Sequence, residues 1–255
     1  MKKIIAIINQ KGGVGKTTTS INLSSGLAMK GKRILLIDLD PQAHSTIGLG
    51  IEPVAALNDV LLSKKSMKEV ILKTKIENLF LVPSHIRLDR VEQQLAPELF
   101  RETFLYKAIR HLDFDFIVID CRPTLGTLTV NALYACNFII VPCEIGRYAL
   151  DGFSDLIETI ENVKNHESLD KVNLIRILLT KYDLRNKVSN DWVIQQLEPY
   201  KELILQTIIR KNEALNQAHM AQEPIFIFKP DSPGAQDYEQ LTNEFLNLCH
   251  RLGKN

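Results

Sequence analysis

Short runs of apolar residues recur along the chain without the polar alternation that marks a half-exposed strand. They are IIAII (4–8), ILLID (34–38), LFLV (79–82), FIVID (116–120), FIIV (138–141), LIRILL (174–179), LILQTII (203–209) and IFIF (225–228). Runs of this length and composition indicate strands that are buried on both faces. Such strands are typical of a mainly parallel sheet that is covered by helices.

Between these runs lie segments in which the apolar residues have helical spacing. One segment, after the first run, carries Ile21, Leu23, Leu27 and Ala28. Another carries Phe153, Leu156, Ile157, Ile160 and Val163. The alternation of strands and helices predicts an α/β fold, a three-layer α/β/α sandwich with a mainly parallel, doubly wound sheet. Ligands of such sheets bind at the carboxyl ends of the strands.

The last segment of the chain has one apolar stripe at helical spacing. The stripe is formed by Tyr238, Leu241, Phe245, Leu248 and Leu252. A helix packed on the sheet and a helix bound to a membrane both fit such a stripe. The polar face carries Glu239 and Glu244 as well as Arg251, which favours packing on the sheet. We therefore expect no stable association with a membrane.

Composition adds limits to this picture. The 255 residues are 45% hydrophobic and 24% charged, which suits one globular domain, residues 1–255, with a sizeable core. The formal net charge of +1 argues neither for nor against a nucleic acid partner, so an anionic partner requires a local patch. The four cysteines form no C-x-x-C pair and are expected to be buried in a reducing cytoplasm. No run approaches the roughly 18 apolar residues of a membrane span.

The segment NQKGGVGKTTT follows the first apolar run and precedes a helical pattern. The usual phosphate-binding loop reads G-x-x-x-x-G-K-[ST]. Gly15, Lys16 and Thr17 match its end, but Gln10 stands where the first glycine belongs, and Lys11 follows it. The order of strand, glycine loop and helix supports a phosphate-loop match, so the sequence predicts a P-loop NTPase fold.

Each part of this loop has a predicted role toward a nucleoside triphosphate. Glycines let the backbone curl so that its N–H groups point at phosphate oxygens, and the following helix adds its positive dipole end. The Lys16 ammonium is expected to reach the β- and γ-phosphates, and the Thr17 hydroxyl is expected to bind Mg²⁺. The predicted ATP-binding residues of the loop are Lys11, Gly12, Gly13, Val14, Gly15, Lys16, Thr17 and Thr18.

Two further apolar runs end in carboxylates. Asp38 and Asp40, in ILLIDLDPQ, are two residues apart at the end of a predicted strand and are expected to face the same side. Asp120 ends the run FDFIVID, which is the Walker B arrangement with a carboxylate near the metal. Carboxylates at these strand ends could orient the Mg²⁺ shell and the attacking water. The alternative for Asp38 and Asp40 is that they cap a turn or a helix.

The loop K-G-G-V-G-K-T-T resembles the deviant Walker A motif of the ParA/Soj/MinD ATPases. The resemblance implies that Lys11 reaches the partner's nucleotide across an ATP sandwich dimer, whereas Lys16 acts within its own subunit. DLDPQ resembles switch I of the family, which implies that Asp40 activates the water and that Asp38 supports it. The implied catalytic residues are Lys11, Lys16 and Asp40, the metal site is Thr17, Asp38 and Asp120, and the cofactors are ATP and Mg²⁺.

Later segments are similar to the same family over nearly the whole chain. EIGRYALDGFSDLIETI is similar to a helix of the family, ILLTKYDLRNKVS to its L-L-T-M-x-D-x-R-x-N segment, and EPIFIFKPDSPGAQDY to a segment near its C-terminal end. These segments favour the ParA/Soj branch over MinD. The resemblance implies an ATPase that is stimulated by a ParB-like partner and binds DNA non-specifically as a homodimer. It also implies association with the nucleoid in the ATP state and partition of a chromosome or plasmid.

Two other functions stay open. A MinD-like ATPase that positions a membrane or protein cargo requires a binding surface for that cargo. A metabolic P-loop enzyme, of the dethiobiotin synthetase or nitrogenase iron-protein type, requires a small-substrate pocket or a pair of cluster cysteines. The sequence displays neither of the latter features.

The segment IRKNEALNQA departs from the family pattern I-P-R-N-V-R-L-S-E-A. Asn212 keeps the position that the resemblance assigns to adenine binding, Lys211 replaces an arginine, and Arg210 replaces the proline. Ala214 replaces an arginine that contacts DNA in relatives, so Ala214→Arg is expected to strengthen DNA binding. Arg185, which matches a second DNA contact of the family, is retained, and the implied DNA-binding residues are Arg185 and Lys211.

Two charge features of the sequence fit more than one role. Arg122 stands at the first proline of the family's D-C-P-P-S-L-G. It is either a flexible cation beside the nucleotide site or the dimer face, where it could tune hydrolysis or partner choice, or an idle surface substitution. Residues 181–211 hold six basic side chains against four acidic ones, a weak footprint for DNA. The basic residues are Lys181, Arg185, Lys187, Lys201, Arg210 and Lys211, and the acidic ones are Asp183, Asp191, Glu198 and Glu202.

Overall fold

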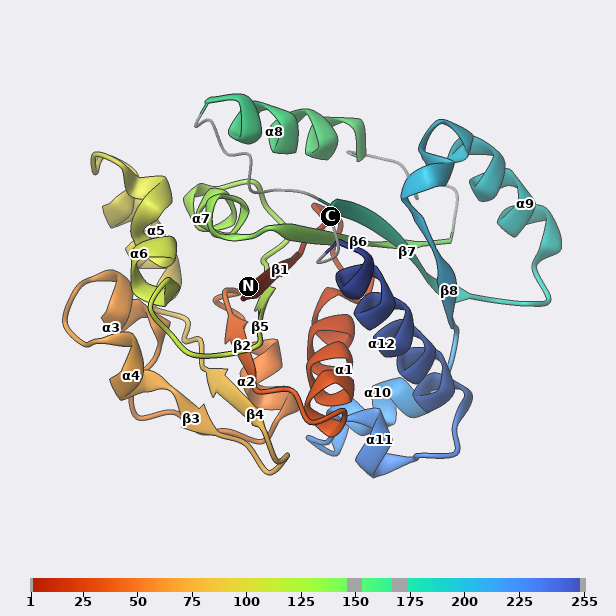
Figure 1. The fold of residues 1–255 in the computed structure, drawn as a ribbon, viewed down its shortest axis with the longest axis horizontal. Helices are drawn as coiled ribbons and strands as arrows, with labels where there is room; N and C mark the ends of the chain where they lie inside the picture. The colour runs from red at the N-terminus through yellow and green to blue at the C-terminus, as the bar shows by residue number, and fades with distance from the viewer. Residues whose placement is uncertain (1, 146–152, 167–173, 253–255) are drawn as a thin grey trace.

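A single eight-stranded sheet organises the computed structural model, which describes residues 2–145, 153–166 and 174–252 (Figure 1). The strand order is β3-β4-β2-β5-β1-β6-β7-β8. All neighbouring pairs are parallel except β3 with β4. The strands are β1 (Lys3–Ile7), β2 (Ile34–Asp38), β3 (Leu72–Lys73), β4 (Leu79–Val82), β5 (Phe116–Asp120), β6 (Phe138–Glu144), β7 (Leu174–Tyr182) and β8 (Ile204–Arg210).

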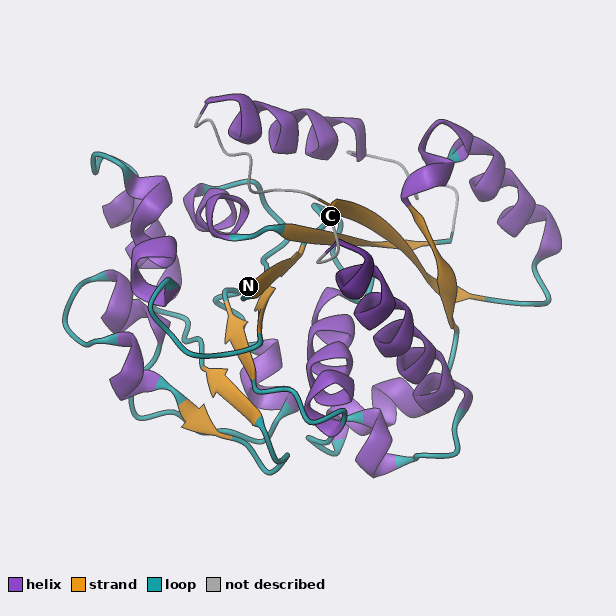
Figure 2. Cartoon of the chain, viewed as in Figure 1, coloured by secondary structure: helices purple, strands orange, loops and turns teal. Residues whose placement is uncertain are grey.

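Helices cover both faces of this sheet (Figures 1 and 2). They are α1 (Lys16–Met29), α2 (His44–Gly48), α3 (Leu57–Leu61), α4 (Met67–Val70), α5 (Leu88–Leu95), α6 (Phe104–Ile109), α7 (Thr127–Ala135), α8 (Phe153–His166), α9 (Lys187–Gln196), α10 (Glu213–Met220), α11 (Ile225–Phe228) and α12 (Pro233–Leu252). Two short 3₁₀ helices are η1 (Arg101–Thr103) and η2 (Glu198–Leu203).

Alternate residues of the strands feed two hydrophobic cores, one on each face. In β1, Ala6 belongs to the core under α3, α5, α6, α7 and α8, whereas Ile5 and Ile7 belong to the core under α1 and α10–α12. Side chains of a strand point alternately to opposite faces, so each strand serves both layers. The α/β fold with a mainly parallel sheet between two helical layers is confirmed.

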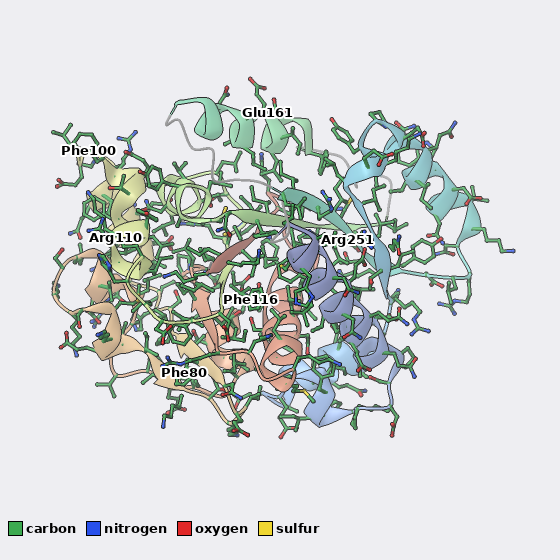
Figure 3. The ribbon with its side chains drawn as sticks, in the orientation of Figure 1. Phe80, Phe100, Arg110, Phe116, Glu161 and Arg251 are labelled. Atoms are coloured by element: carbon green, nitrogen blue, oxygen red, sulfur yellow. The ribbon has the colours of Figure 1, made fainter. Side chains whose placement is uncertain are left out.

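The closing helix α12 packs on the sheet as expected. The Phe245 ring lies 5.6 Å from the Phe138 ring and 6.0 Å from the Phe116 ring, centroid to centroid. Figure 3 shows Phe116 in the interior of the molecule. Among the described helices, none combines the length and the apolar character that crossing a bilayer requires. The four cysteines are buried, as predicted.

The sequence missed some local structure. IFIF was expected to be a strand but forms α11, so that prediction was wrong. Pro224 is the N-cap of α11, and the Ile225 N–H donates to the Asn22 side chain at 2.9 Å. Four apolar residues are too short a run to separate a strand from a helical turn. The antiparallel edge strand β3, only two residues long, was not predicted either.

Helix α1 is more deeply buried than its spacing indicated. We expected one apolar face, but Thr19 through Ala28 are all buried, because α1 lies between the sheet and α12. Gly26 permits this close approach, since a Cβ there would lie 2.3 Å from the Thr242 hydroxyl oxygen. A larger residue at this position would push α1 and α12 apart.

Candidate active site

The predicted phosphate loop connects β1 to α1 at the carboxyl end of the sheet. Gly13 and Gly15 have φ values of +76° and +94°, a region that favours glycine. Gly15 is the N-cap residue of α1, so the N–H groups of the first turn of α1 face the loop. Neither Gly12 nor Gly13 has another atom within 4 Å of the place where a Cβ would stand. The loop therefore leaves open space along its backbone, as a phosphate chain requires.

Lys16 is held inside this loop. The side chain is 7% exposed, and its Nζ donates to the Lys11 carbonyl oxygen at 2.9 Å. Burial lowers the pKa of Lys16, and the negative charges of Asp120 and Asp40 oppose that shift. A buried ammonium with one neutral acceptor is poorly solvated, so the site favours an anionic group beside it.

Residues that the sequence did not point to fix the back of the loop. Asn9 donates from Nδ2 to the Pro142 carbonyl at 2.7 Å and accepts the Lys11 N–H at 2.9 Å. Thr180, at the end of β7, donates to the Val14 carbonyl at 2.8 Å. Val14 itself is 1% exposed. The loop is therefore fastened to the ends of β6 and β7 rather than free to fold over.

Two predicted metal ligands meet at the end of the sheet. Asp38 and Asp120 are Cα partners on the neighbouring strands β2 and β5, and neither side chain is exposed. Thr46 donates to Asp38 Oδ2 from its N–H at 2.8 Å and from its hydroxyl at 2.7 Å. Ser45 and Ser20 donate to Asp120 at 2.7 and 3.1 Å. These three hydroxyls were not predicted, because nothing marks them in the sequence beyond their positions after the glycine loop and after DLDPQ.

The protonation of this pair reflects its burial. Burial, and next the charge of Asp120, raise the pKa of Asp38 to about 8. Burial raises the pKa of Asp120 as well, although hydrogen bonds from Ser45, Thr17 and Ser20 oppose the rise. Two buried carboxyl groups at the ends of neighbouring strands disfavour a second negative charge. A divalent cation between them would remove that penalty.

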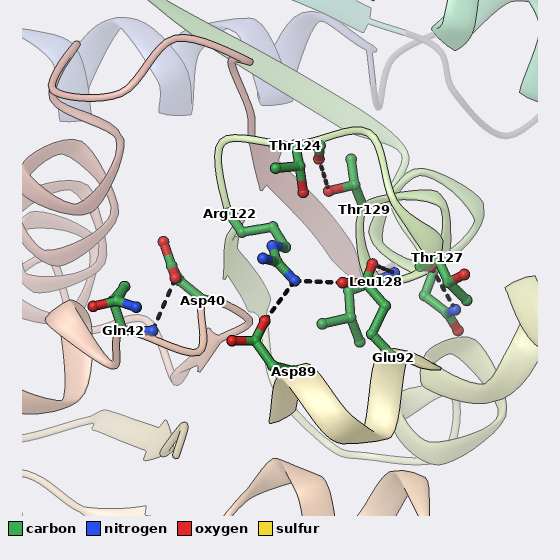
Figure 4. A network of polar contacts seen from close by, with 10 residues as sticks. Asp40, Gln42, Asp89, Glu92, Arg122, Thr124, Thr127, Leu128 and Thr129 are labelled. Carbon is green, nitrogen blue, oxygen red and sulfur yellow. Dashed lines mark hydrogen bonds and ion pairs between the residues drawn. The ribbon is translucent and has the colours of Figure 1, made fainter. Parts of the chain in front are cut away.

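Asp40 lies just beyond β2 and is only half-buried. Its N–H donates to Asp38 Oδ1 at 3.2 Å, and its own carboxylate accepts the Gln42 N–H at 2.9 Å (Figure 4). The charge of Asp40 is felt at both Lys16 and Asp120. The structure thus brings Asp38, Asp40, Asp120 and Lys16 to one place.

Asn212 and its neighbours lie at the start of α10. The Asn212 side chain caps this helix by accepting the Ala214 N–H at 2.9 Å, which leaves its Nδ2 as a donor. Ala214 is 6% exposed and belongs to a core cluster. An arginine at this position must first displace core packing, and the gain in DNA binding expected of Ala214→Arg stays a prediction.

Most of the predicted basic patch is neutralised within the chain. Four of its six cations form ion pairs, which are Lys181–Glu144 at 3.5 Å, Arg185–Asp183 at 2.8 Å, Lys201–Glu198 at 2.8 Å and Arg210–Asp237 at 2.7 Å. Hydrogen bonds from Arg185 hold the pKa of Asp183 well below its usual range. Lys187 and Lys211 form no ion pair in the part of the chain that the structure describes. Arg185 remains 85% exposed.

Arg122 is not a flexible cation. Its Nη1 contacts Glu92 and lies 3.0 Å from Asp89, both on α5, and only 20% of its side chain is exposed (Figure 4). The prediction of a mobile or idle arginine was wrong, because the sequence could not show that α5 brings two carboxylates to this loop. Residues 146–152, which include part of the EIGRYALDGF motif, lie outside the described residues.

Comparisons with known proteins agree with this geometry. A family model described as an AAA domain matches residues 2–174. The sporulation initiation inhibitor protein Soj of Bacillus subtilis is 40% identical over 250 residues, covering 96% of this chain and 98% of that protein. The chromosome-partitioning ATPase Soj of Treponema pallidum is 36% identical, with 96% and 98% covered.

Solved structures are similar as well. Cobyrinic acid a,c-diamide synthase from Mycobacterium smegmatis, crystallised with an ATP analogue and magnesium, has 32% identity and a TM-score of 0.84. The alignment covers 96% of this chain and 95% of that one. A protein with this fold therefore binds an ATP analogue together with magnesium.

Proposed function

This chain belongs to the ParA/Soj family of partition ATPases, and we propose that its ATP cycle controls a homodimer that binds DNA without sequence preference and segregates it with a ParB-like partner. The observation that carries this proposal is the conjunction of the two-lysine loop with the buried Asp38–Asp120 pair. We propose further that residues 1–255 act as one ATPase domain, cytoplasmic and associated with the nucleoid in the ATP state.

The proposed nucleotide site uses the loop and the start of α10. The N–H groups of Gly12 through Thr18 take the phosphate oxygens, and Lys16 exchanges the Lys11 carbonyl for the β- and γ-phosphates. The free Nδ2 of Asn212 donates to the adenine base. Two features support the binding of a triphosphate here. The glycines with positive φ give the loop its curled shape, and the buried Lys16 ammonium has no anionic hydrogen-bond partner among the described residues.

The proposed metal site uses Thr17, Asp38 and Asp120. Mg²⁺ prefers oxygen ligands and keeps several waters, so a few side chains suffice. When bound, the ion supplies charge that neutralises the phosphate oxygens. The raised pKa values of the two carboxyl groups support the fit, because a cation relieves the repulsion between them.

Asp40 is the proposed group that orients the attacking water. Its carboxylate is half-buried, belongs to the loop after β2 and is close enough for its charge to be felt at Lys16. The Gln42 N–H occupies one carboxylate oxygen, which fixes the rotamer and leaves the other oxygen for a water.

Lys11 is proposed to act on the partner's nucleotide. Its carbonyl serves Lys16 of its own subunit, while its ammonium has no hydrogen bond or ion pair within the described residues. A half-exposed cation at the mouth of the loop is suited to an anion that arrives with a second subunit. Two charges on one triphosphate then couple ATP binding to dimerisation.

The internal ion pairs favour a second candidate function. With four of six cations already paired, the DNA surface rests on Lys187, Lys211 and the exposed Arg185. Such a surface suits weak DNA binding that needs two copies for avidity. It equally suits a MinD-like ATPase that positions a protein or membrane cargo.

A gel shift separates the two candidates. The protein is mixed with random-sequence duplex DNA in ATP, ADP or no nucleotide, across a series of salt concentrations. We expect a shift with ATP but not with ADP or without nucleotide. The fraction of DNA shifted should fall steeply as the salt concentration rises, because phosphate contacts release counterions. Arg185→Ala should weaken it on all sequences. No shift at low salt, from protein shown to dimerise in ATP, would remove DNA partition and leave cargo positioning.

A further inference from the structure

Arg122 lies in the six-residue loop that joins the end of β5 at Asp120 to the start of α7 at Thr127. Up to Cys121 this backbone is fixed by the sheet, since the Cys121 N–H donates to the Ile7 carbonyl at 3.2 Å. Beyond that point no strand hydrogen bond holds the loop among the described residues. Side chains of α5 contact it instead, and the Thr129 hydroxyl of α7 donates to the Thr124 carbonyl at 2.5 Å (Figure 4).

Glu92 of α5 holds both ends of this loop. One carboxylate oxygen contacts Arg122 near the start, and the other accepts the Leu128 N–H at 3.1 Å, in the first turn of α7. The loop passes tightly over this carboxylate, since a Cβ on Gly126 would lie 2.2 Å from Glu92 Oε1. One side chain thus fixes where the loop leaves the sheet and where α7 begins.

The contacts of Arg122 are also unusually concentrated. Both carboxylates, Asp89 and Glu92, lie against Nη1, and the buried Nε has no hydrogen-bond partner in the described structure. Only 20% of the Arg122 side chain and 18% of Glu92 are exposed, so water does little to weaken the pair.

We propose that Arg122 is a positioning residue for ATP hydrolysis, which acts through Glu92 and Asp89 to hold the loop behind Asp120 in one conformation. The three residues form the Arg122 latch. Asp120 stands two residues before Arg122, and the contacts of Arg122 begin where the sheet stops holding this backbone, directly after Cys121. This inference rests on the proposed metal role of Asp120.

The test compares Arg122→Ala, Arg122→Lys, Glu92→Gln and the Arg122→Ala/Glu92→Gln double variant. Glu92→Gln keeps an acceptor for the Leu128 N–H and removes the charge that pairs with Arg122. We expect Arg122→Ala and Glu92→Gln to lower kcat about tenfold, because small misplacements of reacting groups slow the chemical step. KM for ATP should stay within about twofold of wild type, because no hydrogen bond or ion pair among the described residues joins Arg122 or Glu92 to the phosphate loop. The Mg²⁺ concentration for half-maximal turnover should rise, and Arg122→Lys should be intermediate.

The double variant reports whether the two residues act as a unit. If they do, its kcat equals that of the worse single variant, because the second change removes nothing further. Arg33→Ala is the matched control. Arg33 pairs with Asp113 at the opposite end of the sheet, so its loss should lower the thermal midpoint and leave kcat and the Mg²⁺ requirement unchanged.

Two results would overturn the latch. One is kcat and Mg²⁺ dependence within about twofold of wild type in Glu92→Gln and Arg122→Ala, even with a lowered thermal midpoint. The other is a kcat in the double variant that is reduced by the product of the two single-variant factors. If Arg122→Ala fails to fold, Glu92→Gln and Arg122→Lys decide by the same criteria. Asp120→Asn tests the proposed metal site independently of the Arg122 latch. Wild-type turnover in Asp120→Asn would contradict the metal site, whatever the result for the latch.

Discussion

Asp38 and Asp120 are paired Cα partners on two neighbouring parallel strands, and both carboxyl groups are fully buried. Hydroxyls from α1 and α2 satisfy their oxygens, but no described cation side chain forms an ion pair with either of them. Parallel strands end at the same edge, so the fold places both groups beside the phosphate loop. Two like charges on adjacent strand ends are unfavourable until a cation joins them, which is the property that the proposed metal site requires.

The first prediction concerns pH. The pKa of Asp38 is raised to about 8, above its usual value near 4. The stability that this group contributes is present below about pH 4 and is lost as the pH rises through about 8, because the folded state must then bury a second charge. Asp38→Asn should abolish that loss, on the order of a few kcal/mol in the free energy of unfolding between pH 4 and 8.

Urea unfolding of nucleotide-free protein across this pH range measures the effect. The control is wild type with ADP and Mg²⁺, which should flatten the same slope. Parallel pH profiles of wild type and Asp38→Asn would show that Asp38 does not titrate in this range.

A second prediction concerns the Arg210–Asp237 pair. Asp237 is 4% exposed and accepts both the Arg210 N–H at 2.8 Å and its side chain. Arg210→Ala should lower the free energy of unfolding by about 1–2 kcal/mol, because it leaves the buried Asp237 carboxylate without its cation. The effect stays this small because Arg210 is partly exposed, so solvent screens the pair. Lys201→Ala breaks an exposed pair and should leave the urea midpoint unchanged. Equal effects of the two substitutions would contradict the structural role assigned to Arg210.

Features that depend on neighbouring residues in the sequence could be predicted, whereas contacts between distant residues could not. The run FIVID ends at Asp120 in the sequence and in the strand, so the carboxylate end of β5 was predictable. Arg122 and Arg210 were not, because their partners Glu92 and Asp237 are 30 and 27 residues away and only the fold brings them close. Ala214 looked like a missing surface arginine because burial of a single helical position leaves no trace in one sequence.

Lys16→Ala should lose most of the affinity for ATP. The helix dipole and the backbone N–H groups replace little of a full charge on the β- and γ-phosphates. Fluorescent ATP titration measures the loss, with Lys187→Ala as a control that removes an exposed cation elsewhere. Wild-type affinity in Lys16→Ala would mean that the buried ammonium serves the loop and not the nucleotide.

Asp40→Ala should bind ATP and hydrolyse it far more slowly. The loop after β2 would lose the carboxylate that orients the water, while Lys16 and the glycines remain. Sizing chromatography in ATP and Mg²⁺ should then show an accumulated dimer. If Asp40→Ala stays monomeric in ATP and turns over ATP at the wild-type rate, the assignment of Asp40 is wrong.

The central claim is that each ATP lies between two subunits, with Lys16 and Asp40 from one and Lys11 from the other. Mixing Lys11→Ala with Asp40→Ala, both nearly inactive alone, tests it most directly. In a mixed dimer, the site on the Lys11→Ala subunit has its own Asp40 and receives Lys11 from its partner. An equal mixture should therefore recover up to about a quarter of wild-type turnover, since half of the dimers are mixed and each has one complete site. Turnover that stays at the sum of the two variants would contradict the claim, because it would place Lys11 on the nucleotide of its own subunit.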